Sequence, residues 1–111
     1  MTDEMITKNE VLNDGKTIHL YYSEMYKEYV AYGFSAYLAE NVEPQIRARV
    51  RPLFSYSESL QMPFVLVDEK SLRSLEMKMK TVERIKEHIC LEGNLVLNEE
   101  KYVEWASLMR G

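Results

Sequence analysis

The sequence predicts a mixed α/β fold: a small mixed sheet of about four strands with a short helix, a long amphipathic helix and a C-terminal helix packed on it. Three stretches carry this prediction. Residues 17–22 are β-branched and aromatic, which is typical of a strand. Residues 62–67 form a short continuous apolar run, typical of a central strand covered on both faces. From residue 72 onward, apolar residues recur at intervals of three and four, the period of an amphipathic helix.

The N-terminal residues 1–13 show no clear periodicity and are expected to form a partly ordered arm. A turn signal, Asn13-Asp14-Gly15-Lys16, follows the arm. Residues 14–111 are expected to form a single α/β domain, because the length suits one domain and no linker interrupts it.

Residues 25–42 fit two structures. The aromatic residues follow helical spacing, but Val30, Tyr32 and Phe34 also alternate as a strand would. The density of aromatic residues favours a strand over roughly residues 28–34, and Ser35 reads as the cap of a short helix that ends before Pro44. We therefore expect a hairpin followed by a helix, rather than one long helix.

The next stretch predicts another strand. Residues 47–51 alternate between arginine and apolar side chains, and residues 53–56 continue in an extended style after Pro52, which indicates an edge strand or a bulge. This alternation would place Arg47, Arg49 and Arg51 in a row on one side of that strand.

Two helices are expected in the C-terminal half. The first covers residues 69–91, with a cap at Asp68 or Ser71 and a stop at Gly93. Residues 95–97 form a short strand or a linker. The second helix covers residues 98–110, begins at Asn98 and packs Trp105 against the core.

Composition restricts the class of protein. Cys90 is the only cysteine, so an intramolecular disulfide is excluded and a structural zinc site of the usual kind lacks thiols. The net charge of −4 weakens attraction to phosphate backbones and anionic membranes. The start of the chain is acidic where a secretory signal would be basic, and no apolar run approaches the roughly 18 residues of a membrane span. A cytoplasmic protein without a membrane partner is expected.

No catalytic, metal or cofactor constellation is found in the sequence. Inside a helix over residues 69–91, His88 and Cys90 would point about 200° apart and could not share a site. Nothing in the sequence places His19 near Cys90, so an inert cysteine is expected. The glycines are scattered singly, which excludes a glycine-rich phosphate loop.

Two features remain as candidate binding surfaces. The arginine row at Arg47, Arg49 and Arg51 could hold phosphates or carboxylates, although a solvated strand face is the favoured interpretation. A dense set of aromatic residues between residues 21 and 37 could stack on bases or anchor a protein interface, although most of them are expected to be core or half-buried sheet residues.

The order of elements over about residues 17–80 resembles the N-terminal mismatch-recognition domain of MutS-type DNA repair proteins. The similar pieces are Leu20-Tyr21-Tyr22, Tyr26-Lys27-Glu28, Tyr37-Leu38-Ala39, Gln61-Met62-Pro63 and Leu72-Arg73-Ser74-Leu75. The resemblance implies that Tyr26 stands at the place of the family's wedging phenylalanine. It also implies that Glu28 stands at the place of the glutamate that contacts a base.

The sequence alone does not determine the function. A non-enzymatic binding or interaction module, with an unknown protein partner or self-association, is the first hypothesis. The alternative is a nucleic-acid-binding domain using Tyr26, Glu28 and the three arginines. A small-molecule enzyme that uses tyrosine and arginine side chains is the third hypothesis, and no cofactor is expected.

Overall fold

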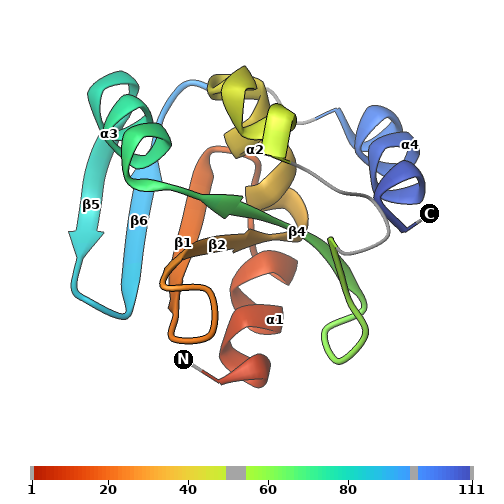
Figure 1. Ribbon diagram of the computed structural model, residues 1–111. Coiled ribbons are helices and arrows are strands. Elements are labelled where there is room, and N and C mark those ends of the chain that lie inside the picture. Colours follow the sequence, from red (N-terminus) through yellow and green to blue (C-terminus); the bar gives the residue numbers. More distant parts are fainter. Residues whose placement is uncertain (1, 50–54, 96–97, 111) are drawn as a thin grey trace.

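The described residues form six antiparallel strands, which make one sheet in the order β3-β4-β2-β1-β6-β5 (Figure 1). This computed structural model describes residues 2–49, 55–95 and 98–110. The strands are β1 (Thr17–Ser23), β2 (Glu28–Tyr32), β3 (Tyr56–Ser57), β4 (Met62–Val67), β5 (Lys80–Arg84) and β6 (His88–Glu92). The helices are α1 (Asp3–Val11), α2 (Gly33–Val42), α3 (Glu69–Lys78), α4 (Glu99–Arg110) and the 3₁₀ helix η1 (Pro44–Arg49). The mixed α/β class is confirmed, but the described sheet has six strands rather than about four, and its pairings are antiparallel rather than mixed.

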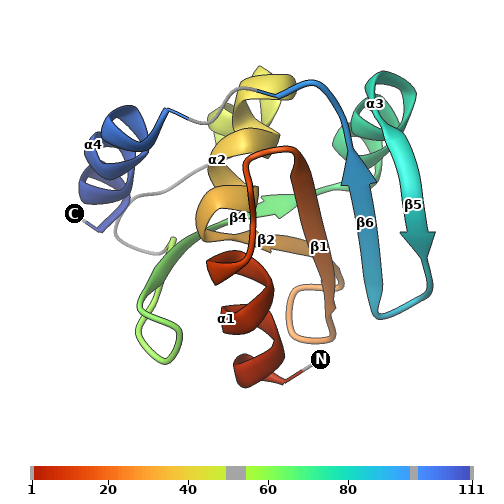
Figure 2. The same ribbon diagram turned by 180° about the vertical axis from the view of Figure 1, so that it is seen from behind.

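The helices lie on both faces of the sheet. Helices α2, α3 and α4 lie on one side, and α1 lies on the other (Figures 1 and 2). The side that α2 and α3 cover holds the main core. Alternation along the strands supplies that core, because Ile18 pairs with Leu91 and Leu20 pairs with Ile89, and all four are fully buried.

Residues 1–13 were expected to form an arm, but residues 3–11 form helix α1. The Thr2 hydroxyl accepts a hydrogen bond from the Met5 backbone N–H at 3.2 Å and caps its start. Ile6 packs against Tyr21 and Leu60 on the sheet. Helix α1 has no apolar stripe that the sequence pattern could reveal, because its buried residues are only Ile6 and the acid Glu10, four residues apart.

The hairpin and helix expected over residues 25–42 are confirmed in place of one long helix. Tyr22 of β1 faces Tyr29 of β2 across the hairpin. Helix α2 begins at Gly33, before the predicted cap, so Ser35 lies buried within its first turn. Gly33 has a φ of 55°, which lies in the left-handed region, and a Cβ there would be 2.9 Å from the Met62 Sδ atom.

The strand predicted over residues 47–51 is wrong for its described part. Residues 44–49 form η1, where the chain turns after Pro44 with three residues per turn, so residues two apart do not share a side. Arg51, Pro52 and residues 53–54 lie outside the described residues. The strand predicted over residues 62–67 matches β4, which lies between β3 and β2.

The single helix predicted over residues 69–91 is also wrong. Helix α3 ends at Lys78, and the chain continues as the β5–β6 hairpin. Only Leu72 and Leu75 of the periodic set pack into the core from α3, while Ile89 and Leu91 do so by strand alternation. The apolar residues over 79–89 therefore have helical spacing in the sequence but lie in a β-hairpin, in which side chains alternate with a period of two.

The C-terminal helix is confirmed as α4. The Asn98 Oδ1 atom accepts a hydrogen bond from the Lys101 backbone N–H at 3.0 Å, as expected of an N-cap. Trp105 is buried against the core, as predicted. Of the segment 95–97, Leu95 packs against the core, and residues 96–97 lie outside the described residues.

Candidate functional site

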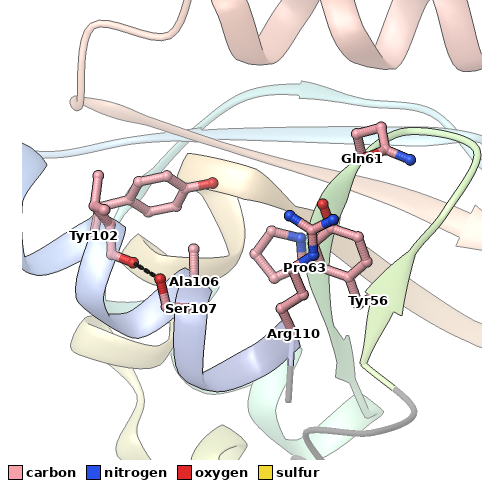
Figure 3. Close-up of a pocket in the computed structure, with 8 residues that line it drawn as sticks. Tyr56, Gln61, Pro63, Tyr102, Ala106, Ser107 and Arg110 are labelled. Atoms are coloured by element: carbon pink, nitrogen blue, oxygen red, sulfur yellow. Dashed lines mark hydrogen bonds between the residues drawn. The ribbon is translucent and has the colours of Figure 1, made fainter.

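A pocket with a volume of about 180 Å³ lies between α4 and the β3–β4 hairpin (Figure 3). Tyrosine rings, a proline and small apolar side chains form most of its wall. The lining residues are Tyr56, Gln61, Pro63, Tyr102, Val103, Ala106, Ser107 and Arg110. The pocket thus combines an apolar wall with few polar groups, which is the usual composition of a specific binding site.

Helix α4 supplies both a core side and a pocket side. Trp105 and Met109 are buried against the core of the domain. Tyr102 and Arg110, eight residues apart, line the pocket from the adjacent side of the helix. The Trp105 Nε1 atom donates a hydrogen bond to the Glu40 carboxylate at 2.9 Å, so α4 is held in place against α2.

Arg110 brings a positive charge to the pocket. Its guanidinium carbon lies 5.2 Å from the centre of the Tyr56 ring, a cation–π arrangement. Tyr56 is itself held by its pairing with Pro63 in the β3–β4 hairpin. Among the described residues that line the pocket, none is acidic. A carboxylate is therefore the ligand group that the pocket complements best.

Tyr102 forms a rigid wall with a hydroxyl group that can donate. Its ring packs against Phe34 and Tyr37, with ring centres 4.4 and 5.8 Å away. Burial, together with the nearby Glu10 and Tyr56, raises the pKa of Tyr102 to about 12, so the phenol stays protonated. Figure 3 shows its hydroxyl pointing from α4 toward the hairpin side of the pocket.

A second hollow, of about 250 Å³, lies beside the β1–β2 turn. It is lined by Tyr22, Lys27, Glu28, Tyr29, Val67, Glu69, Leu72 and Arg84. Its two cations are matched by two carboxylates, and Arg84 also forms an ion pair with Glu76. This hollow therefore presents no net charge to a ligand.

Among the described residues, the structure does not bring Tyr26 and Glu28 together with Arg47. Tyr26 lies in the β1–β2 turn, 44% exposed, and Glu28 begins β2. Arg47 lies on η1, where it forms an ion pair with Glu40 at 2.9 Å. The β1–β2 turn and η1 lie at opposite ends of the molecule in both views (Figures 1 and 2). The side chain of Arg49 and the whole of Arg51 lie outside the described residues, so nucleic-acid binding stays a prediction.

A histidine pair on the sheet was missed at the sequence level. The Nδ1 atom of His19 lies 2.9 Å from the Nε2 atom of His88, and the Nδ1 atom of His88 lies 2.6 Å from a Glu83 carboxylate oxygen. The expected helix separated His88 from Cys90, but in strand β6 both point to the same face. The alternation of Ile89 and Leu91 could have revealed this arrangement.

Two titrating groups of this cluster are shifted. Burial, reinforced by His88, lowers the pKa of His19 to about 4, so its imidazole is neutral at neutral pH. Burial, followed by the nearby carboxylates of Glu83, Glu92 and Glu10, raises the pKa of the Cys90 thiol. These shifts agree with the expectation of an unreactive cysteine.

No family model, curated protein or solved structure matches the chain. The resemblance to the MutS mismatch-recognition domain therefore stays a prediction about the fold. Within the described residues, no helix combines the length and the apolar character needed to cross a membrane.

Proposed function

We propose that this chain is a binding module whose α4 pocket takes an aromatic or large apolar side chain next to a carboxylate, supplied by a partner protein. The single observation that carries the proposal is the guanidinium of Arg110, stacked on Tyr56 at an apolar pocket without acidic lining residues. A guanidinium and a phenol that stays protonated both donate hydrogen bonds, and a carboxylate accepts from both.

The size of the pocket favours a side chain over a small-molecule cofactor. Its volume of about 180 Å³ is below the roughly 300–1,000 Å³ of typical small-molecule sites. In protein interfaces a few anchoring side chains in well-packed pockets supply most of the binding energy, and tyrosine and arginine are enriched among them. A peptide segment with such an anchor matches both the volume and the lining of the pocket.

Contacts with α2 hold the α4 wall of the pocket in place. Tyr102 packs on Phe34 and Tyr37 of α2, and Trp105 is hydrogen-bonded to Glu40 of the same helix. Walls held in this way lose little conformational entropy on binding. A weak but specific response to a minimal ligand is therefore expected.

The test uses two small probes that differ in one group, N-acetyl-phenylalanine and its amide. Each is titrated into ¹⁵N-labelled protein, and backbone chemical shifts are followed by NMR. We expect the acid to shift residues 56–63 and 102–110 with a Kd on the order of 1 mM. The amide should bind at least fivefold more weakly, because it lacks the charge that pairs with Arg110.

The outcomes separate the possibilities. Equal shifts with both probes would contradict carboxylate recognition, and shifts confined to the second hollow would move the binding site there. Self-association is tested in parallel by analytical ultracentrifugation. A dimer that blocks the probe would identify a second copy of the chain as the occupant and would contradict a separate partner.

A further inference from the structure

The uncovered end of the sheet carries a cluster of metal-ligating side chains. Helix α1 lies along β1, β2 and β4 and leaves the β6–β5 end of its face open (Figure 2). His19 of β1 lies directly across from Cys90 of β6, and Cys90 lies across from Glu83 of β5. His88 is two residues from Cys90 on the same strand. Strand alternation therefore places all four side chains on one face.

Hydrogen bonding sets the orientation of the two imidazoles. The Glu83 carboxylate oxygen lies 2.6 Å from the His88 Nδ1 atom and accepts a hydrogen bond from its N–H group. The His88 Nε2 lone pair then points at the His19 Nδ1 atom, 2.9 Å away. The Tyr21 ring stacks on His88 with ring centres 5.1 Å apart, which holds the imidazole in place. Metal-binding histidines are commonly oriented by a carboxylate in this manner.

We propose that His19 and His88 bind a divalent transition-metal ion, Zn²⁺ or one of similar ligand preference, between their facing nitrogen atoms. The ion replaces the shared proton, which moves to the Nε2 atom of His19 and leaves the imidazole neutral. Zinc–nitrogen bonds of about 2.0–2.1 Å place two such nitrogens roughly 3.3 Å apart in tetrahedral geometry. The observed 2.9 Å therefore has to widen by only a few tenths of an ångström.

The surroundings favour a cation. Glu83 is 52% exposed along its side chain, so the cluster is open to solvent at this edge. Glu83, Glu92 and Glu10 all contribute negative potential at Cys90. Among the described residues of the paired strands, Lys80, opposite Glu92, is the one cation on this face.

The site has two protein ligands as it stands. Within the described residues, no three histidine, cysteine or acidic side chains surround a common point. Water completes the coordination, and Cys90, across from His19, is the nearest further ligand if its side chain turns. This proposal is independent of the α4 pocket.

The test measures Zn²⁺ binding by isothermal titration calorimetry and Co²⁺ binding by visible absorption, with the metal-free chain at neutral pH. We expect one ion per chain with micromolar affinity. His19→Gln and His88→Gln should each weaken binding at least 100-fold, and Glu83→Gln about tenfold, as expected for an orienting carboxylate. Glu87→Gln, which removes an exposed acid from the same hairpin, is the matched control and should leave affinity unchanged.

Cobalt absorption also identifies the role of the cysteine. A thiolate charge-transfer band that disappears in Cys90→Ser would establish Cys90 as a third ligand, and its absence with binding retained would establish the two-histidine site. No saturable binding at 100 µM metal ion would overturn the proposal, as would equal affinity in the double histidine variant. Thermal melts show whether each variant is folded. If His88→Gln unfolds, His19→Gln, whose position is half-buried, provides the test.

Discussion

The carboxylate of Glu10 on α1 accepts hydrogen bonds from the Ser35 backbone N–H at 2.9 Å and from the Ser35 hydroxyl at 2.7 Å. Ser35 lies in the first turn of α2, so the acid sits at the positive end of that helix. Burial nevertheless dominates and raises the pKa of Glu10 from its usual 4.5 to about 7. The contact that joins α1 to α2 therefore titrates near neutral pH.

Glu10 should make the stability of the domain depend on pH. Between pH 4.5 and 7 the folded protein holds a proton on Glu10 that the unfolded chain has released. Stability from this group is therefore present at low pH and is lost as pH rises through about 7, with a slope of up to about 1.4 kcal/mol per pH unit. In Glu10→Gln, urea unfolding should lack this component. The control Glu4→Gln, at an exposed position on α1, should retain the parent pH profile.

Substitutions on either side of the α3–β5 junction separate the observed hairpin from a long helix. Leu75 is fully buried, so Leu75→Asp should cost at least about 3 kcal/mol and abolish the folded circular dichroism signal. Val82 is 56% exposed at the irregularity of β5, so Val82→Asp should change stability by less than about 0.5 kcal/mol. A helix over residues 69–91 would bury both side chains, and equal unfolding by both variants would contradict the hairpin.

Gly33 should resist replacement. Gly33→Ala forces a Cβ into a left-handed backbone position 2.9 Å from the Met62 Sδ atom, at a cost of about 1–3 kcal/mol. Gly93 lies outside the left-handed region, and in Gly93→Ala the new Cβ would meet the Met79 side chain at 3.3 Å, so a smaller loss is expected. Thermal unfolding of the two variants provides the comparison, and equal losses would argue against a special role for Gly33.

Cys90 should react slowly in the folded protein. Its thiol is half-buried, and burial with three nearby carboxylates raises its pKa and suppresses the thiolate. Maleimide labelling at pH 7, followed by mass spectrometry, should be at least tenfold slower than in urea. Equal rates in the two conditions would show that the thiol is free and activated.

Part of this fold follows directly from local chemistry. The β-branched run at residues 17–22, the apolar run at residues 62–67 and the Asn98 cap each match their elements, because one strong local signal decides them. The helix predicted beyond Leu75 is wrong, because Val82 and Ile85 are exposed. Their spacing resembles the apolar stripe of a buried helix, but neither side chain is buried. The histidine pair could not be predicted either, since His19 and His88 are 69 residues apart in sequence and meet only through the β1–β6 register.

Only the α4 side of the pocket could be predicted from the sequence. The amphipathic spacing of α4 indicated that Trp105 faces inward, and Tyr102 lies three residues before it, on the same side of the helix. Nothing in the sequence indicated that Tyr56 and Pro63 would stand opposite Arg110, because that contact joins segments distant in the chain. Binding sites built between a terminal helix and a short hairpin depend on tertiary packing that periodicity does not report.

The most direct test of the proposed function compares two charge-neutralising variants of α4. Arg110→Gln removes the guanidinium at the pocket, whereas Lys101→Gln removes an exposed cation that does not line it. Both are titrated with N-acetyl-phenylalanine while NMR shifts of residues 56–63 and 102–110 are followed. We expect Arg110→Gln to weaken binding at least fivefold and Lys101→Gln to leave the Kd within twofold of the parent. Equal affinities in the two variants would contradict the claim that Arg110 recognises a partner's carboxylate.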